Sequence, residues 1–247
     1  MSDARSGLSL QGISKQFGAI AALTELSMEI GRGEIHGLIG PNGAGKTTAV
    51  NVATGIYRPS AGSVLLDGAD VTSMCAHRRA TRGLGRSFQG ARLFDGLDVE
   101  TNIRVSVEQR RKHQRQSCAK GDVFTEVGRL MEEAHLTPVA RRDARSLPYG
   151  IRKQVEIVRS CAFASCALLL DEPTSGLSPE EIDRVLGIIR RHHARLAVLI
   201  IEHDMEVIMS MCDRVTVIDA GRWLMTGTPA EVQQDQEVIR AYLGSDE

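Results

Sequence analysis

The octapeptide GPNGAGKT, Gly40 to Thr47, restricts the fold of this chain more than any other feature. It follows the apolar segment EIHGLIG (34–40) and runs into KTTAVNVATGI, whose apolar residues have helical spacing. Glycines in such a loop let backbone N–H groups turn inward around an anion, and the helix that follows adds its N-terminal dipole. A strand, a loop of the G-x-x-x-x-G-K-[ST] type and a helix in this order predict a phosphate-binding loop.

The residue types inside this loop suit a nucleoside triphosphate with Mg²⁺. We expect Lys46 to reach the β- and γ-phosphates and the Thr47 hydroxyl to bind Mg²⁺. The remaining predicted nucleotide contacts come from the same stretch: Asn42, Gly43, Ala44, Gly45 and Thr48. The alternative, a glycine turn that binds nothing, is disfavoured by the strand and helix on either side.

Two adjacent carboxylates end a second apolar segment, Ala167 to Glu172. At the end of a buried strand Asp171 can hold Mg²⁺ through water, and Glu172 is placed to polarise an attacking water as general base. An ordinary strand-to-loop exit looks similar, so the pair has weight only together with the phosphate-binding loop. Together they favour hydrolysis of the triphosphate.

The distribution of strand and helix patterns predicts the fold class. Segments 8–14 and 25–30 alternate apolar and polar residues as strands do, and SVLLDGADV (63–71) contains a DG turn signal. From Cys166 onward strand and helix patterns alternate, which is typical of a parallel sheet covered by helices. Between about 98 and 145 the chain is charged and helical. We therefore expect an α/β core with a helical insert.

Composition excludes several other classes. The net charge of −1 gives no reason to expect a nucleic-acid partner, and no apolar run approaches the length of a membrane span. The five cysteines lack zinc-ligand spacing, which indicates reduced thiols, with Cys161 and Cys166 expected in the core. Most histidines are interpreted as structural or solvated, with His192 and His193 at a helix end that suits cations. The basic run 109–116 is expected to be a solvated helix face, with contact to anionic lipid as the alternative.

Five motifs in order resemble those of the ATP-binding subunits of ABC transporters, over nearly the whole chain. They are GPNGAGKT (40–47), SFQGARLF (87–94), LPYGIRKQVEIVRS (147–160), LLLDEPTSGLSPEE (168–181) and LIIEHDM (199–205). The resemblance implies a P-loop NTPase core with a parallel sheet flanked by helices, an N-terminal antiparallel β subdomain and a helical insert. It also implies one domain over 1–247, with a helical subdomain at about 98–160.

The same resemblance assigns roles to further residues. Gln89 would link Mg²⁺ and the attacking water to a transmembrane partner, and His203 would contact the γ-phosphate. Phe17 would stack on adenine, as an aromatic ring can. Tyr149 and Gly150, at the start of a helix, would close over ATP bound to a second ATP-binding subunit. Without the family, each of these residues would be interpreted as an ordinary loop or core residue.

The match is closest to the ATP-binding subunits of branched-chain amino acid importers, on FQGARLF, IEHDM and the tail GTPAEVQQDQEVIRAYLG. This group implies transmembrane permease subunits, a second ATP-binding subunit in a homo- or heterodimer, and indirectly a periplasmic solute-binding protein. The implied location is the cytoplasmic face of the inner membrane. Lipopolysaccharide and urea or amide systems remain alternatives, as does a catalytically weak partner in a mixed ATPase dimer.

The segment LPYGI departs from the family pattern at two positions. The usual serine is replaced by Pro148, which has neither hydroxyl nor N–H, and the usual glutamine by Ile151. The apolar stripe of Ile151, Val155 and Val158 still predicts a sound helix with one buried face. Weaker nucleotide-driven closure at the site that this helix completes is therefore expected.

Three other classes fit less well. Soluble ABC ATPases of translation or DNA repair usually carry two cassettes or a long coiled coil, and this chain shows neither. A GTPase would need an N-K-x-D motif, which the sequence lacks. A small-molecule kinase would leave 147–160 and His203 without a role.

Overall fold

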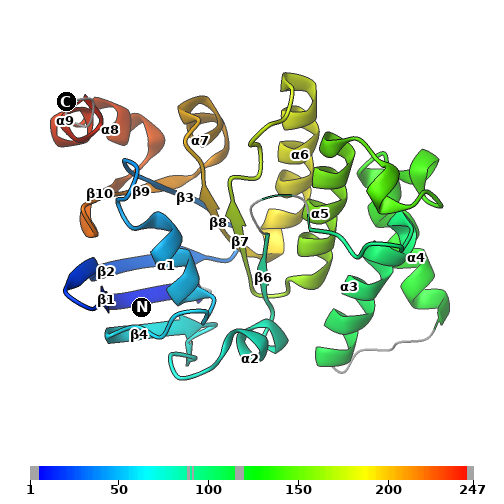
Figure 1. Ribbon diagram of the computed structural model, residues 1–247, viewed down its shortest axis with the longest axis horizontal. Helices are drawn as coiled ribbons and strands as arrows, with labels where there is room; N and C mark the ends of the chain where they lie inside the picture. The colour runs from blue at the N-terminus through cyan, green and yellow to red at the C-terminus, as the bar shows by residue number, and fades with distance from the viewer. Residues whose placement is uncertain (1–5, 88–89, 91, 115–119, 244–247) are drawn as a thin grey trace.

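The computed structural model describes residues 6–87, 90, 92–114 and 120–243 (Figure 1). Among these residues the strands are β1 (Ser6–Phe17), β2 (Ile20–Gly31), β3 (Ile35–Ile39), β4 (Ala61–Leu66), β5 (Ala69–Asp70), β6 (Leu84–Arg86), β7 (Ala167–Asp171), β8 (Ala197–Ile201), β9 (Arg214–Asp219) and β10 (Arg222–Gly227). The α-helices are α1 (Lys46–Ala53), α2 (Ala76–Thr81), α3 (Val99–His113), α4 (Lys120–Glu133), α5 (Tyr149–Phe163), α6 (Pro179–His192), α7 (Met205–Met211), α8 (Pro229–Gln234) and α9 (Gln236–Leu243). Short 3₁₀ helices are η1 (Thr137–Val139), η2 (Ala144–Ser146) and η3 (His193–Arg195).

The strands form one mixed sheet in the order β5-β4-β1-β2-β10-β9-β3-β8-β7-β6. Strands β9, β3, β8, β7 and β6 run parallel, whereas β5, β4, β1 and β2 pair antiparallel. A single pairing of Arg222 with Thr24 joins the two halves through β10. The predicted fold class, a parallel core with an antiparallel β part and flanking helices, is confirmed.

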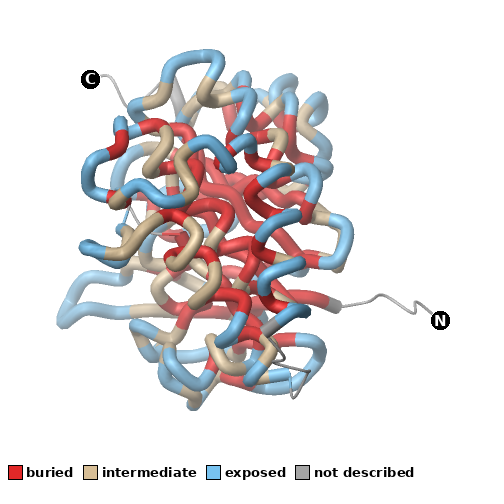
Figure 2. Tube along the Cα trace, turned by 90° about the vertical axis from the view of Figure 1, so that its right-hand side faces the viewer, coloured by how far each residue is buried: buried red, intermediate tan, exposed pale blue. Residues whose placement is uncertain are grey.

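Alternating residues of the central strands face two separate hydrophobic layers, because successive side chains of a strand point to opposite faces. Leu168 and Leu170 of β7 join the core built with α3 to α6, while Ala167 and Leu169 join the core with α1 and the antiparallel strands. Figure 2 shows the buried segments running through the middle of the molecule, with exposed chain around them. The apolar strands are thus covered on both faces, as parallel sheets usually are.

The local predictions from sequence hold at several points. Asp67 and Gly68 both have positive φ, which makes the expected tight turn between β4 and β5. In α5, Val155 and Val158 are buried and Ile151 packs against the same core, which confirms the apolar stripe. The sequence reasoning missed α2, β6, β10, α8 and α9, which are short segments.

The basic run is not a simple solvated face. Helix α3 extends to His113, and Arg110 is buried in an ion pair with Glu126 of α4. Arg111 donates from Nε to the same carboxylate at 2.9 Å. The expectation of a solvated face is therefore wrong for these two arginines, because α4 supplies carboxylates against this face.

Burial also decides the state of several histidines and cysteines. Burial lowers the pKa of His192 to about 4, so its ring is neutral near pH 7, and the expectation of a cationic helix end is wrong for this residue. His36 is buried between Glu34 and Thr216, in agreement with a structural role. Cys161 and Cys166 lie in the core as predicted, and burial raises the pKa of each thiol to about 12.

Candidate functional site

The phosphate-binding loop joins β3 to α1, as the sequence predicts. Three of its glycines have positive φ: Gly40 at 154°, Gly43 at 80° and Gly45 at 102°. A Cβ on Gly40 would collide with the carbonyl oxygen of Ile218 on β9. A Cβ on Gly43 would meet nothing within 4 Å, so the loop is open on that side. Glycine is therefore required at position 40 by the neighbouring strand, and at Gly45, the N-cap of α1, by the backbone.

The Lys46 ammonium lies across this loop. Its Nζ donates to the carbonyl oxygens of Gly40 at 2.6 Å and Pro41 at 2.9 Å. Burial lowers the pKa of Lys46, and the nearby carboxylates of Glu172 and Asp171 act in the opposite direction. A cation that is held only by carbonyl oxygens among the described residues suits the exchange of those contacts for phosphate oxygens.

The loop forms one wall of a cavity of about 260 Å³. The residues that line it are Asn42, Gly43, Ala44, Gly45, Lys46, Thr47, Thr48, Glu172, Ile201, Glu202 and His203. The structure thus brings the whole predicted loop together with two of the three predicted catalytic residues. They arrive from α1, from the end of β7 and from the end of β8, because parallel strands present their carboxyl ends at one edge.

Glu172 follows β7 in an unusual backbone conformation. Its φ is +49°, in the left-handed region that non-glycine residues seldom adopt. The conformation is held by its backbone N–H, which donates to the carbonyl of Ile201 at 2.9 Å. Strained backbone of this kind tends to occur at functional sites, where the surrounding structure maintains it.

Asp171 is buried at the last position of β7, beside an arginine that the sequence reasoning did not select. Arg86 of β6 lies 3.4 Å from the Asp171 carboxylate. It also donates to Asn51 Oδ1 of α1 at 2.7 Å and to the Oγ1 of Thr54, the C-cap of that helix, at 3.2 Å. Burial raises the pKa of the Asp171 carboxyl, while the charge of Arg86 opposes that rise. The predicted metal ligands Thr47 and Asp171 offer a hydroxyl and a carboxylate, which are hard oxygen donors that suit Mg²⁺.

Glu202 is a second residue that the sequence reasoning missed. It follows β8 and is 1% exposed, whereas the neighbouring His203 side chain is 71% exposed. Glu202 Oε1 accepts from the backbone N–H of Thr174 at 2.8 Å and from its hydroxyl at 2.6 Å. The only signal in the sequence was its place beside His203 in LIIEHDM.

Among the described residues, four predicted site residues do not line this cavity: Phe17, Asp171, Tyr149 and Gly150. The Phe17 ring, 41% exposed, packs edge-on against Tyr57 with centroids 5.2 Å apart, and Lys15 Nζ lies 4.9 Å from its centroid. Its role toward adenine stays a prediction. Gln89 lies outside the described residues, so its predicted role is untested.

Tyr149 and Gly150 start α5, where Tyr149 contacts the loop at Ser175 and Gly176 and Gly150 lies against Glu181 of α6. The Tyr149 hydroxyl donates to the Ser175 carbonyl at 3.3 Å, and the Glu181 carboxylate covers Gly150 where a Cβ would stand. Pro148 is the N-cap of α5 and makes no side-chain capping bond, as its residue type predicts. Neither Tyr149 nor Gly150 lines the cavity described above, and their predicted role at a second subunit's nucleotide is untested.

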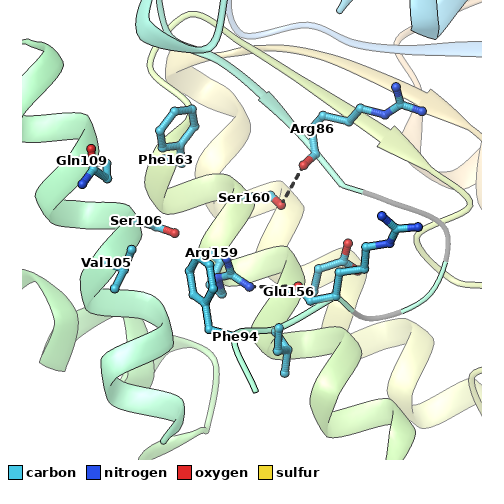
Figure 3. Close-up of a pocket in the computed structure, with 11 residues that line it drawn as sticks. Arg86, Phe94, Val105, Ser106, Gln109, Glu156, Arg159, Ser160 and Phe163 are labelled. Atoms are coloured by element: carbon cyan, nitrogen blue, oxygen red, sulfur yellow. Dashed lines mark hydrogen bonds between the residues drawn. The ribbon is translucent and has the colours of Figure 1, made fainter. Parts of the chain in front are cut away.

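A separate groove of about 390 Å³ opens between α3, α5 and the segment after β6 (Figure 3). The Phe94 ring, 45% exposed, lies under the Arg159 guanidinium at 4.3 Å, and Arg159 donates to the Arg92 carbonyl at 2.9 Å. Arg159 Nε has no hydrogen-bond partner among the described residues. The charged side chains of the lining are Arg86, Arg92, Arg159 and Glu156, and Glu156 already pairs with Lys153 at 3.1 Å. The groove therefore combines an apolar floor with the Arg159 guanidinium above it.

Comparison with known families agrees with this geometry. Residues 23–175 match the family model described as ABC transporter. The chain belongs to the ABC transporter ATP-binding family. Residues 224–247 of this ABC ATPase match a second model, described as branched-chain amino acid ATP-binding cassette transporter. Proteins of this family bind and hydrolyse ATP as transporter subunits.

Relatives along the whole length of the ABC ATPase support the same group. It is 36% identical to the high-affinity branched-chain amino acid transport ATP-binding protein LivG of Escherichia coli and 34% identical to BraF of Pseudomonas aeruginosa, in both cases over 96% of this chain and 97% of the relative. The lipopolysaccharide export system ATP-binding protein LptB of Haemophilus influenzae is 34% identical over the same shares. Among solved structures, a nucleotide-free ATP-binding cassette of an ABC transporter superposes with a TM-score of 0.82 at 24% identity, over 96% of this chain and 98% of the other.

Proposed function

We propose that this ABC ATPase energises the import of branched-chain amino acids or of a related small polar solute. The observation that carries the choice of solute class is the C-terminal match at 224–247, in a segment outside the ATPase motifs that most of the family shares. The full-length identity to LivG and BraF points the same way. The LptB relative makes lipopolysaccharide export the second candidate, and urea or amide import the third.

In this proposal the predicted site residues have separate roles toward ATP. The N–H groups of the loop and the Lys46 ammonium hold the phosphates, and Glu172 accepts a proton from the attacking water. Thr47 and Asp171 would hold Mg²⁺, with Gln89 as a third ligand, and the bound ion would neutralise part of the phosphate charge. His203, exposed at the rim of the cavity, contacts the γ-phosphate.

We further propose that two ATP-binding subunits face each other, so that Tyr149 and Gly150 meet the nucleotide on the opposite subunit. The free N–H groups at the start of α5 suit the γ-phosphate. Pro148 and Ile151 remove side-chain contacts there, which favours pairing with a non-identical ATPase that completes the other site. The segment 98–160 would act as the helical subdomain of a single domain, 1–247.

The groove beside Arg159 is the proposed docking surface for a permease subunit. Its apolar floor around Phe94 fits a short amphipathic segment, and the Arg159 guanidinium, whose Nε has no partner among the described residues, favours a partner that contributes a carboxylate. No described helix of this chain is long and apolar enough to cross a bilayer, so the membrane path would come from the permease. The subunit would then sit peripherally at the cytoplasmic face of the inner membrane, with a periplasmic solute-binding protein as an indirect partner.

The ATPase part of the proposal is tested with purified protein. Wild type should hydrolyse MgATP, whereas Glu172→Gln should lose at least about a hundredfold in kcat and still bind the nucleotide. Glu180→Gln is the matched control, because its side chain is 88% exposed. A Glu172→Gln protein with wild-type turnover would remove Glu172 from the mechanism.

The solute is tested with the transporter purified from native membranes. The copurified permease and ATPase chains are placed in liposomes together with the solute-binding protein, and ATP-driven uptake of leucine, urea and amides is measured. Leucine uptake that stops with the Glu172→Gln subunit is the expected result. Copurification with a lipopolysaccharide-transporting membrane complex would replace the import proposal by the second candidate.

A further inference from the structure

Glu202 connects two segments of the candidate site. Through Oε1 it accepts both the N–H and the hydroxyl of Thr174, which lies two residues after Glu172. Along the chain it is adjacent to His203. Two short hydrogen bonds to one oxygen hold the Glu202 side chain in one rotamer, so the position of its second carboxylate oxygen is also fixed.

That second oxygen is the unexplained feature. Glu202 Oε2 is buried and has no hydrogen-bond partner among the described residues, although it lies 3.9 Å from His203 Nδ1. A buried carboxylate oxygen is costly to leave unpaired, whereas the imidazole beside it is 71% exposed and can turn. A small rotation of the ring would bring Nδ1 within hydrogen-bond distance of Oε2.

We propose that Glu202 is a positioning residue that orients His203 for the nucleotide by accepting from the Nδ1 side of its ring. The inference rests on the proposed function. With Nδ1 engaged by the carboxylate, Nε2 is the ring nitrogen left to face the phosphates, because a second partner fixes which end of an imidazole is presented. Thr174 holds Glu202 in turn, so the segment after Glu172 and the segment that carries His203 keep their relative position.

A purely structural role for Glu202 predicts something different. The bonds to Thr174 alone would stabilise the loop, and their loss would lower the melting temperature without acting through His203. A positioning role predicts that the effect of altering Glu202 depends on the presence of the His203 ring. A double-mutant cycle separates these two cases.

The experiment compares wild type, Glu202→Gln, His203→Ala and the double variant, each measured for kcat, KM, affinity for a nonhydrolysable ATP analogue and melting temperature. Glutamine keeps an acceptor for Thr174 and removes the charge that faces His203. We expect Glu202→Gln to lower kcat by about tenfold with KM changed less than about twofold. In the His203→Ala background the same change should alter kcat by less than about twofold. Glu206→Gln, an exposed acid four residues further on, should match wild type.

Thr174→Val provides a second route, because it loosens the same carboxylate without touching its charge. It should lower kcat by about threefold in the presence of His203 and have no effect on kcat in its absence. If the Glu202 and His203 effects multiply instead, or if only the melting temperature moves, the positioning role is refuted. A wild type that binds no ATP analogue would refute the proposed function itself, and the two failures are therefore distinguishable.

Discussion

Replacing Arg79 by methionine should destabilise the whole fold, although the residue touches no part of the nucleotide cavity. Arg79 of α2 is 0% exposed, and its guanidinium donates to four backbone carbonyls. These belong to Val52 at 2.7 Å, Ala53 at 2.8 Å, Thr72 at 2.9 Å and Met74 at 3.1 Å. Two of the four are carbonyls at the C-terminal end of α1, and of these the Val52 carbonyl also accepts from the Gly55 N–H at 3.1 Å.

The expected loss follows from these four bonds. A buried carbonyl left without a donor costs about 1 kcal/mol at the low end. The Val52 carbonyl keeps the Gly55 N–H, so the other three together cost about 3 kcal/mol. Burial lowers the pKa of Arg79, which shows that the buried cation is itself costly, and this keeps the estimate at the low end. For a chain of this size about 3 kcal/mol corresponds to a fall of about 9 °C in melting temperature.

The assay is equilibrium unfolding in urea, followed by circular dichroism at one protein concentration. Arg78→Met is the matched control, because Arg78 precedes Arg79 in the same helix and is exposed. It should change the free energy of unfolding by less than about 0.5 kcal/mol. A loss below about 1 kcal/mol for Arg79→Met would show that water or a rearranged loop satisfies these carbonyls, and the reasoning would be wrong.

Three further predictions concern the loop, a buried histidine and the thiols. Gly40→Ala should abolish binding of a fluorescent ATP analogue, because its Cβ would meet the Ile218 carbonyl. The control is Gly12→Ala, which has a positive φ but open space around the Cβ and should bind normally. Equal binding by both variants would contradict the steric argument. His192 has a folded pKa of about 4, below its unfolded value. Its contribution to stability, up to about 3 kcal/mol, is therefore complete above about pH 6.5 and is lost as the pH falls toward about 4. His192→Gln should flatten this part of the profile of urea stability against pH, and an unchanged slope would contradict the prediction. In the native protein iodoacetamide should label the exposed Cys75 and spare Cys161, Cys166 and Cys212, because burial raises the pKa of each of these three thiols to about 12. Labelling is measured by mass spectrometry, and rapid labelling of the three would contradict their burial.

Much of the site was predictable because its chemistry is local in sequence. A glycine-rich loop between an apolar strand and a helix fixes its own backbone, so Gly40 to Thr48 could be assigned from residue types alone. Glu172 followed from its place at the end of an apolar strand, whereas the role of His203 followed only from the family resemblance. The resemblance also placed Tyr149 and Gly150 at the N-terminus of a helix, and in the structure they are the first two residues of α5.

The residues that the sequence reasoning missed act across long sequence separations. Arg86 reaches Asp171 over 85 positions, and Glu202 reaches Thr174 over 28. Neither has a pattern around it that differs from an ordinary strand end. The basic run around Arg110 was misjudged for the same reason, since its partner Glu126 lies on another helix.

The sequence by itself therefore determined the strand–loop–helix unit, the fold class and the family, because these depend on backbone preferences and on the spacing of residues within short segments. Only the tertiary structure decided which charges are paired, that His192 is neutral, and that Glu202 has a buried oxygen beside His203. Burial and the partners of a charged group come from distant segments that the parallel sheet brings to one edge. That arrangement is a property of packing, which no single segment contains.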